Sequence, residues 1–263
     1  MYIFKLSLKI IGQIIFVIIF FSTLQAKNLN KFNDADRVSD YFSGILLLQD
    51  NLYDESFKFF KKLNGLEEIH NNYSIKYLYT LINSRNFNEA FNYSRKLEKK
   101  KLDSFESHLI TGIYYLKNSN LNLAKKYFLK AKNINSRFVL NNFVSSSLYN
   151  WTDLKSANIN SSTLELEKLD KRFENLKKIQ NIFLNCYYSN SNTNKLFVEL
   201  NSNKKTDFSR YEYFHASYAI SLGNISLAKN IVQSALKLYP RNLLLNQYNI
   251  DLNEGENLVV FNL

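Results

Sequence analysis

The stretch "TGIYYLKNSNLNLAKKYFLKA", residues 111–131, places small residues among large apolar ones. Its apolar positions follow helical spacing in two runs, and the polar link "KNSN" at 117–120 separates them. The stretch therefore predicts two antiparallel helices. We expect Gly112 on the first helix to face Ala124 on the second, and Ala131 to meet the next hairpin. Larger side chains there would push the helices apart, at a cost of about 1–3 kcal/mol.

The same pattern recurs at a fixed step of 34 residues. Ser56, Ala90 and Ala124 are 34 residues apart, and Gly44 lies two such steps before Gly112. The polar links "QDN" at 49–51 and "NSRN" at 83–86 recur with them. A fixed period of this length is typical of a repeat solenoid, in which each unit stacks on its neighbours.

The order of small, aromatic, aliphatic and alanine positions resembles the tetratricopeptide repeat (TPR). The matching segments are residues 37–70, 71–104, 105–138 and 209–242. The second fits less well, because Leu78 stands where a small residue is expected and Ser94 where an aromatic one is expected. In the last, Pro240 stands where the family commonly has a proline. The resemblance implies an all-α fold, a right-handed superhelical solenoid of antiparallel helical hairpins.

The organisation that we expect has five parts. They are a signal peptide at 1–26, three repeats at 37–138, an irregular helical segment at 139–208, a repeat at 209–242, and the start of a further repeat or a capping helix at 243–263. The irregular segment leaves the register, because Ala124 and Ala228 are two residues further apart than three periods. We interpret it as two degenerate hairpins with a longer loop around "SANINSS", or as an inserted helical domain. We also expect the chain to be the N-terminal part of a longer solenoid.

The N-terminus has the order of a secretory signal peptide. Lys5 and Lys9 precede an apolar run, Ile10–Phe21. The stretch "STLQA" then ends at Ala26, and a polar sequence follows. The run is shorter than the about 20 residues that span a bilayer. We therefore expect a bacterial protein exported to the periplasm. The alternative is an uncleaved anchor in the inner membrane, facing the periplasm.

The histidines and the cysteine of this sequence form no catalytic or metal-binding motif. His70, His108 and His215 form no metal-binding pattern, and Cys186 is the only cysteine. Cys186 would act as a nucleophile only with a base from elsewhere in the fold.

Neither acids nor glycines form a catalytic motif. The adjacent acids Asp54-Glu55 and Glu67-Glu68 point in different directions around a helix, so we interpret them as solvated. The six glycines do not cluster into a phosphate-binding loop. We expect no enzymatic activity, cofactor, metal ion or small-molecule substrate.

The net charge of +11 allows attraction to an anionic surface. The lysines are scattered, and the densest run, "RKLEKKK" at 95–101, ends a predicted helix, where cations complement the helix dipole. We interpret these lysines as solvated helix faces. An alternative function is that of an envelope-associated assembly component that docks anionic lipid or polymer.

The TPR resemblance implies a scaffold that binds a protein or peptide on a concave surface. Its lining would be first-helix positions that point away from the second helix: Tyr41, Ile45, Gln49, Ile75, Tyr79, Asn83, Leu109, Ile113 and Lys117. Aliphatic and tyrosine walls suit a peptide better than nucleic acid. We expect Tyr41 and Tyr79 to be the anchors. The alternative is that some of these residues pack between hairpins.

One use of the family is disfavoured by the residues present. TPR domains that clamp the C-terminal carboxylate of chaperones use lysine and asparagine on the first hairpin and basic residues on the third. Tyr41 and Ile45, then Glu106 and Ile110, stand at the matching positions here.

The signal-peptide hypothesis predicts that the native protein begins near Lys27, because cleavage would follow Ala26. N-terminal sequencing of protein from the source cells measures this. Recovery of Met1 would favour the anchor.

Overall fold

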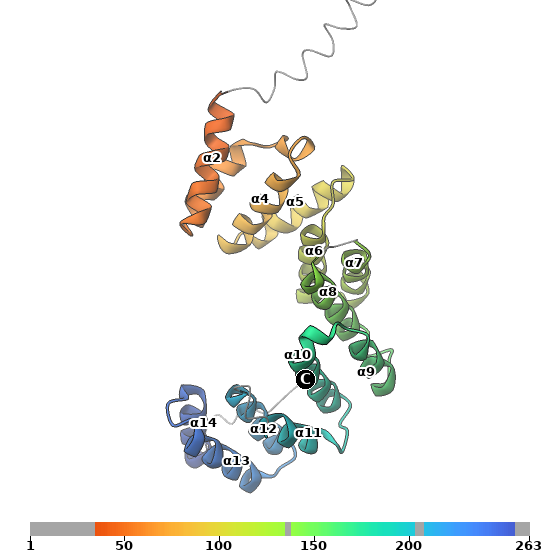
Figure 1. Ribbon diagram of the computed structural model, residues 1–263, viewed down its shortest axis with the longest axis vertical. Helices are drawn as coiled ribbons and strands as arrows, with labels where there is room; N and C mark the ends of the chain where they lie inside the picture. Colours follow the sequence, from red (N-terminus) through yellow and green to blue (C-terminus); the bar gives the residue numbers. More distant parts are fainter. Residues whose placement is uncertain (1–34, 135–137, 203–207, 256–263) are drawn as a thin grey trace, which may run out of the picture. The chain divides into compact units, whose positions relative to one another are not determined.

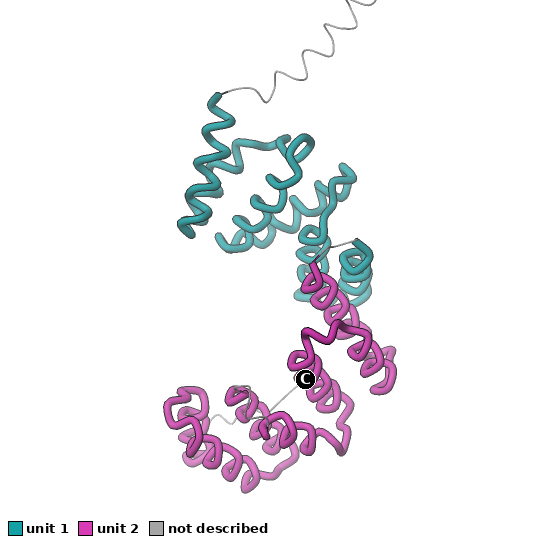
Figure 2. Tube along the Cα trace, in the orientation of Figure 1, with its two compact units in different colours: residues 1–134 teal, residues 135–263 magenta. Residues whose placement is uncertain are grey.

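The computed structural model describes residues 35–134, 138–202 and 208–255. Within them the chain forms helices and no β-strand, which confirms the all-α fold class. No helix in these segments has the length and hydrophobicity needed to cross a bilayer. The predicted signal peptide, residues 1–26, lies outside the described residues. The chain divides into two compact units, residues 1–134 and 135–263 (Figure 2).

Unit 1 consists of three consecutive helical hairpins (Figure 1). Its helices are α2 (Ala35–Gln49), α3 (Tyr53–Lys62), α4 (Asn71–Asn83), α5 (Phe87–Lys99), α6 (Phe105–Lys117) and α7 (Leu121–Asn133), with a 3-10 turn η1 (Leu66–Glu68) before α4. The links within the hairpins, residues 50–52, 84–86 and 118–120, fall at the polar stretches that the sequence predicts.

These links share a left-handed backbone residue at the same step. Asn51, Arg85 and Ser119 have φ of 60°, 61° and 58°, and Ser189 and Gly223 have φ of 51° and 74° in unit 2. A left-handed residue ends a helix by turning the chain away from its axis. The turn geometry therefore repeats even where the residue is not glycine, so a chain with six glycines forms these hairpins.

Unit 2 continues with hairpins of less regular length. Its helices are α8 (Val139–Thr152), α9 (Ile159–Glu167), α10 (Glu174–Tyr187), α11 (Thr193–Asn201), α12 (Ser209–Ser221), α13 (Ile225–Leu238) and α14 (Leu243–Glu254), with a 3-10 turn η2 (Lys171–Phe173). Over both units the second helices begin at residues 53, 87, 121, 159, 193 and 225, in steps of 34, 34, 38, 34 and 32. The longer link at 153–158 contributes to the predicted loss of register.

Each hairpin of unit 1 is closed by a buried pair of positions 16 residues apart. A Cβ atom on Gly112 would lie 2.5 Å from the Phe128 ring, and one on Gly44 would lie 2.8 Å from the Phe60 ring. Both rings are fully buried. The Phe128 ring is thus the group nearest to the missing side chain of Gly112, because a ring needs the space that a missing side chain leaves.

The second hairpin has the same pair with the sizes exchanged. Leu78 and Ser94 stand one period after Gly44 and Phe60, and both are buried. The weak TPR match of residues 71–104 therefore reflects an exchange of large and small side chains, which keeps the combined volume of the pair. In the α12–α13 hairpin the equivalent residues are Ala216 and Val232, both fully buried and of intermediate size.

This pairing predicts that Gly112→Leu is destabilising alone, by about 1–3 kcal/mol, because the added side chain meets the Phe128 ring. Phe128→Ser alone should cost about 3–5 kcal/mol. The double variant reproduces the pair of the second hairpin, so it should lose less than the sum by about 1 kcal/mol or more. Urea denaturation measures all three. The control cycle combines Gly112→Leu with Leu63→Ser, which changes a buried residue of another hairpin. In that cycle the losses of unfolding free energy should add. Additivity in both cycles would contradict the pairing.

Candidate functional site

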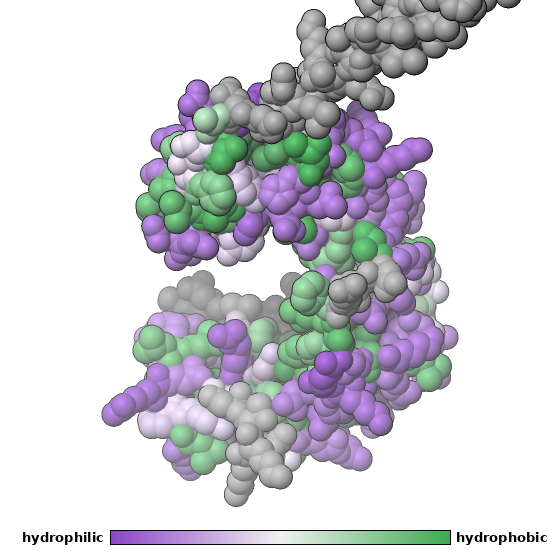
Figure 3. Space-filling model, turned by 45° about the horizontal axis from the view of Figure 1, so that its top comes forward, coloured by the Kyte–Doolittle hydropathy of each residue, from purple (hydrophilic) through white to green (hydrophobic). Residues whose placement is uncertain are grey.

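The first helices of unit 1 leave apolar side chains exposed to solvent. Ile75 and Tyr79 on α4 and Ile113 on α6 are exposed, and the Tyr79 side chain retains 53% of its accessible surface although its ring lies 6.2 Å from that of Tyr53. Helices α4 and α6 contact each other. Figure 3 shows hydrophobic residues among hydrophilic ones on the visible surface. These three predicted positions therefore lie on neighbouring helices.

The remaining predicted positions differ in exposure. Gln49, Asn83 and Lys117 are exposed at the ends of their helices, and Leu109 is half-buried. The Asn83 side chain donates to the Tyr79 carbonyl oxygen of its own helix, at 2.8 Å.

On α2 the predicted residues pack inward. Tyr41 and Ile45 lie against the buried cluster of unit 1, and the Tyr41 ring is centred 6.2 Å from Phe60 and 5.0 Å from His70. Burial also raises the pKa of Tyr41. Tyr41 and Ile45 therefore pack into the fold, as the alternative interpretation expected, and do not line an open groove.

A different stripe of α2 is exposed, and the sequence analysis missed it. Val38, Phe42 and Leu46 retain 49% to 60% of their accessible surface and follow one another at steps of four, on one helix face. At equivalent positions of later hairpins, Ile110 packs against the buried cluster and Thr80 is fully buried. The sequence contained a signal for this stripe. Helix α2 is apolar on two faces, whereas one apolar face is enough to pack against α3.

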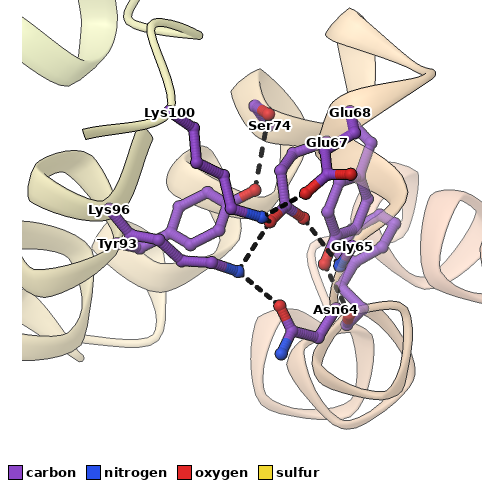
Figure 4. Close-up of polar contacts among 10 residues, drawn as sticks. Asn64, Gly65, Glu67, Glu68, Ser74, Tyr93, Lys96 and Lys100 are labelled. Atoms are coloured by element: carbon purple, nitrogen blue, oxygen red, sulfur yellow. Dashed lines mark hydrogen bonds and ion pairs between the residues drawn. The ribbon is translucent and has the colours of Figure 1, made fainter. Parts of the chain in front are cut away.

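A buried carboxylate joins the first two hairpins (Figure 4). The Glu67 side chain is fully buried and receives hydrogen bonds from Lys96 at 2.6 Å, Lys100 at 2.9 Å and the Gly65 backbone N–H at 2.8 Å. Lys100 also pairs with Glu68, at 2.6 Å. The interpretation of Glu67 as solvated is wrong, because Lys96 of α5 and Lys100, which follows α5, bind it.

Several residues of the basic run at 95–101 thus form ion pairs within the fold. Lys96 and Lys100 hold Glu67, while Arg95 and Lys130 pair with Glu98. Burial of the Glu67 carboxylate favours a higher pKa, but the hydrogen bonds from the two lysines and the backbone outweigh it and lower the pKa to about 2. The group is therefore a charged structural tie rather than a proton donor at neutral pH.

A cleft of about 340 Å³ beside this tie is lined by tyrosines that are already hydrogen-bonded. The Tyr73 hydroxyl donates to the Phe60 carbonyl oxygen at 2.8 Å, and the Tyr77 hydroxyl donates to Glu89 at 3.3 Å. Burial raises the pKa of both tyrosines. Their hydroxyl groups therefore stabilise the fold and are poorly suited to proton transfer.

Two of the histidines and the cysteine are held by contacts within the fold. His108 is buried 2.9 Å from Asp103, and burial lowers its pKa. His215 is bonded to Asn194 at 2.8 Å. Burial raises the pKa of the Cys186 thiol to about 12, which disfavours a nucleophilic thiolate. In the described part of the chain, no three metal-ligating side chains cluster.

The fold is similar to solved structures at low sequence identity. A chain of the APC/C hetero-tetramer Cut9–Hcn1 matches with a TM-score of 0.52 and 10% identity, over 82% of this chain and 42% of that chain. A TPR repeats protein from Bacteroides fragilis matches with a TM-score of 0.39 and 13% identity, over 84% of this chain and 100% of that one. A thermophilic TPR protein of Thermus thermophilus gives 0.38 and 13%, over 83% and 99%.

No protein-family model matches the sequence, and no curated protein is significantly similar to it. The chain spans less than half the length of the Cut9–Hcn1 chain that it matches. Together with the repeated hairpins, the structural likeness establishes a TPR-type helical-repeat fold.

The Glu67 tie predicts a loss of stability in acid. Because its pKa in the folded state is about 2, below the ordinary 4.5, its contribution is complete above pH 4.5 and is lost as the pH falls towards 2. The loss is on the order of 3 kcal/mol. Urea denaturation at several pH values measures it. Glu67→Gln should flatten the dependence, and the exposed Glu68→Gln should change it little. Equal pH dependence in Glu67→Gln and the native chain would contradict the tie.

Proposed function

We propose that this chain is an exported scaffold that binds a protein or peptide through the first helices of unit 1. We give the name first-helix surface to two exposed sets of apolar residues: Ile75, Tyr79 and Ile113 on α4 and α6, and the separate α2 stripe, Val38, Phe42 and Leu46. Single exposed apolar residues are common on proteins, whereas groups of them mark interaction sites. Their concentration on the first helices is the observation that carries the proposal.

The arrangement of these residues suits an apolar partner segment. The side chains at α4 and α6 lie on helices that contact each other, and the α2 stripe presents residues at steps of four. A tyrosine hydroxyl at Tyr79 adds one polar group to this surface. An amphipathic helix or an extended peptide with aliphatic side chains matches such a surface.

Binding without chemistry on the partner is favoured by the state of the reactive groups. Glu67 is committed to two lysines, His108 to Asp103, and the Cys186 thiol has a raised pKa. The structural likeness to a subunit assembly, the Cut9–Hcn1 hetero-tetramer, supports a role in protein interaction by fold analogy. Export to the periplasm remains part of the proposal and rests on residues 1–26.

A Tyr79→Ala/Ile113→Ala variant tests the surface, because both side chains are exposed and their loss leaves the core intact. The protein and its variants are immobilised, and proteins bound from an envelope extract are quantified by mass spectrometry. We expect the variant to lose the bound partner at least tenfold, since central anchors contribute about 2 kcal/mol each. Tyr41 is unsuitable for this test because it packs on Phe60.

The matched control is Leu129→Ala, which removes an exposed apolar residue of the second helix α7 and should retain the partner. Retention should also persist from low to physiological salt, because the surface is apolar. Equal capture by the Tyr79→Ala/Ile113→Ala variant would overturn the proposal. Loss of capture at physiological salt would favour docking to an anionic lipid or polymer instead.

A further inference from the structure

A cleft in unit 2 lies between two short second helices. Helices α9 and α11 have nine residues each, whereas the first helix between them, α10, has fourteen, and both pack on it (Figure 1). Nine-residue helices leave part of a fourteen-residue neighbour uncovered. The cleft that results has a volume of about 570 Å³, and a smaller cavity of about 180 Å³ shares Asn181, Leu196 and Glu199 with it. Ligand sites in proteins have volumes of about 300–1,000 Å³.

Asparagines dominate the polar lining of this cleft. They come from α9, α10 and the link before α11: Asn160, Asn181, Asn185, Asn190 and Asn192. An asparagine side chain carries one acceptor oxygen and an NH₂ group with two hydrogens to donate. The cleft therefore presents donors and acceptors together.

The fold leaves part of this hydrogen-bonding capacity unused. Asn185 is only 6% exposed, and its NH₂ group donates to the carbonyl oxygen of Asn181 at 2.8 Å and to the side-chain oxygen of Asn181 at 3.2 Å. Among the described residues, no donor reaches the Oδ1 atom of Asn185. Because Asn185 lines the cleft, its Oδ1 atom can accept a hydrogen bond from an occupant.

Asn192 gives a second, independent indication. It occupies the N-cap position of α11, but its side chain makes no capping hydrogen bond. At four other helix starts the N-cap asparagine does cap its helix: Asn120, Asn158, Asn224 and Asn242. Asn86 at α5 does not cap, but its side chain donates to Ser84 instead. Because capping is the usual structural role of asparagine at this position, the side chain of Asn192 is left available at the cleft.

The chemistry of the cleft selects among possible occupants. The cleft is lined by Lys195 against Glu167 and Glu199, and the adjoining cavity adds Lys178, so the charges of the two together balance and an ionic ligand gains little. Leu164 is exposed and offers an apolar contact. None of the described lining residues is aromatic, which disfavours a sugar ring that would need a flat apolar face.

We infer that this amide-lined cleft binds an extended, uncharged peptide segment through its backbone, at a site separate from the first-helix surface. An extended backbone offers one N–H donor and one C=O acceptor per residue, which an asparagine amide matches in both directions. The side chains of the peptide contribute less, apart from an aliphatic residue against Leu164. Binding therefore selects uncharged peptides that carry an aliphatic residue, and it is insensitive to salt.

The probe is a phage-displayed library of random twelve-residue peptides, selected on the purified full-length chain. Selected peptides are synthesised, and their affinities are measured by fluorescence anisotropy. Asn185→Leu, of similar size, removes the buried amide, and Asn160→Ala/Asn192→Ala removes two exposed ones without touching the core. We expect each variant to weaken binding at least tenfold. The matched control, Asn230→Ala, removes an exposed asparagine of α13 and should change the affinity less than twofold.

The outcomes separate this inference from the proposed function. The Tyr79→Ala/Ile113→Ala variant should bind the selected peptides as the native chain does. If Asn185→Leu proves unstable by thermal denaturation, the exposed double variant decides. The inference is overturned if no peptide is enriched, if the cleft variants bind with unchanged affinity, or if an array of oligosaccharides binds the cleft while peptides do not.

Discussion

The structure depends on how closely the two helices of a hairpin can approach. That distance is set by two buried positions 16 residues apart, which hold one large and one small side chain. Gly112 accepts the Phe128 ring, and in the next hairpin towards the N-terminus the sizes are exchanged between Leu78 and Ser94. Because only the combined volume is constrained, either order forms a hairpin. A rule that demands a small residue at one fixed position therefore describes this chain incompletely.

Stacking of hairpins is the second requirement, since one hairpin cannot bury its apolar faces alone. Polar ties fix this stacking in unit 1. Glu67 is bound by lysines 29 and 33 residues later, and Glu98 accepts from the Tyr127 hydroxyl 29 residues later, at 3.0 Å. Part of the basic excess of the chain is thus explained by contacts inside the fold rather than by an anionic partner.

The sequence predicted those features that repeat and that depend on neighbours along the chain. The helices, their polar links and the exposure of Tyr79 follow from a 34-residue period with helical spacing. The burial of Glu67 could not be read in this way, because it depends on lysines of the next hairpin. The inward packing of Tyr41 depends likewise on Phe60 and His70. The cleft of unit 2 arises because α9 and α11 are short, and the length of a second helix does not follow from the repeat period.

Both proposed surfaces include a first helix that is only partly covered: the α2 stripe is exposed, and α9 and α11 are shorter than α10. The central claim is that each first helix is stabilised by the hairpins beside it. Native-state hydrogen exchange of the free full-length chain tests this claim most directly. In unit 1, the amides of α4 should exchange slowest and those of α2 fastest among the first helices, because the α2 stripe is uncovered. Equal protection of α2 and α4 would contradict the account.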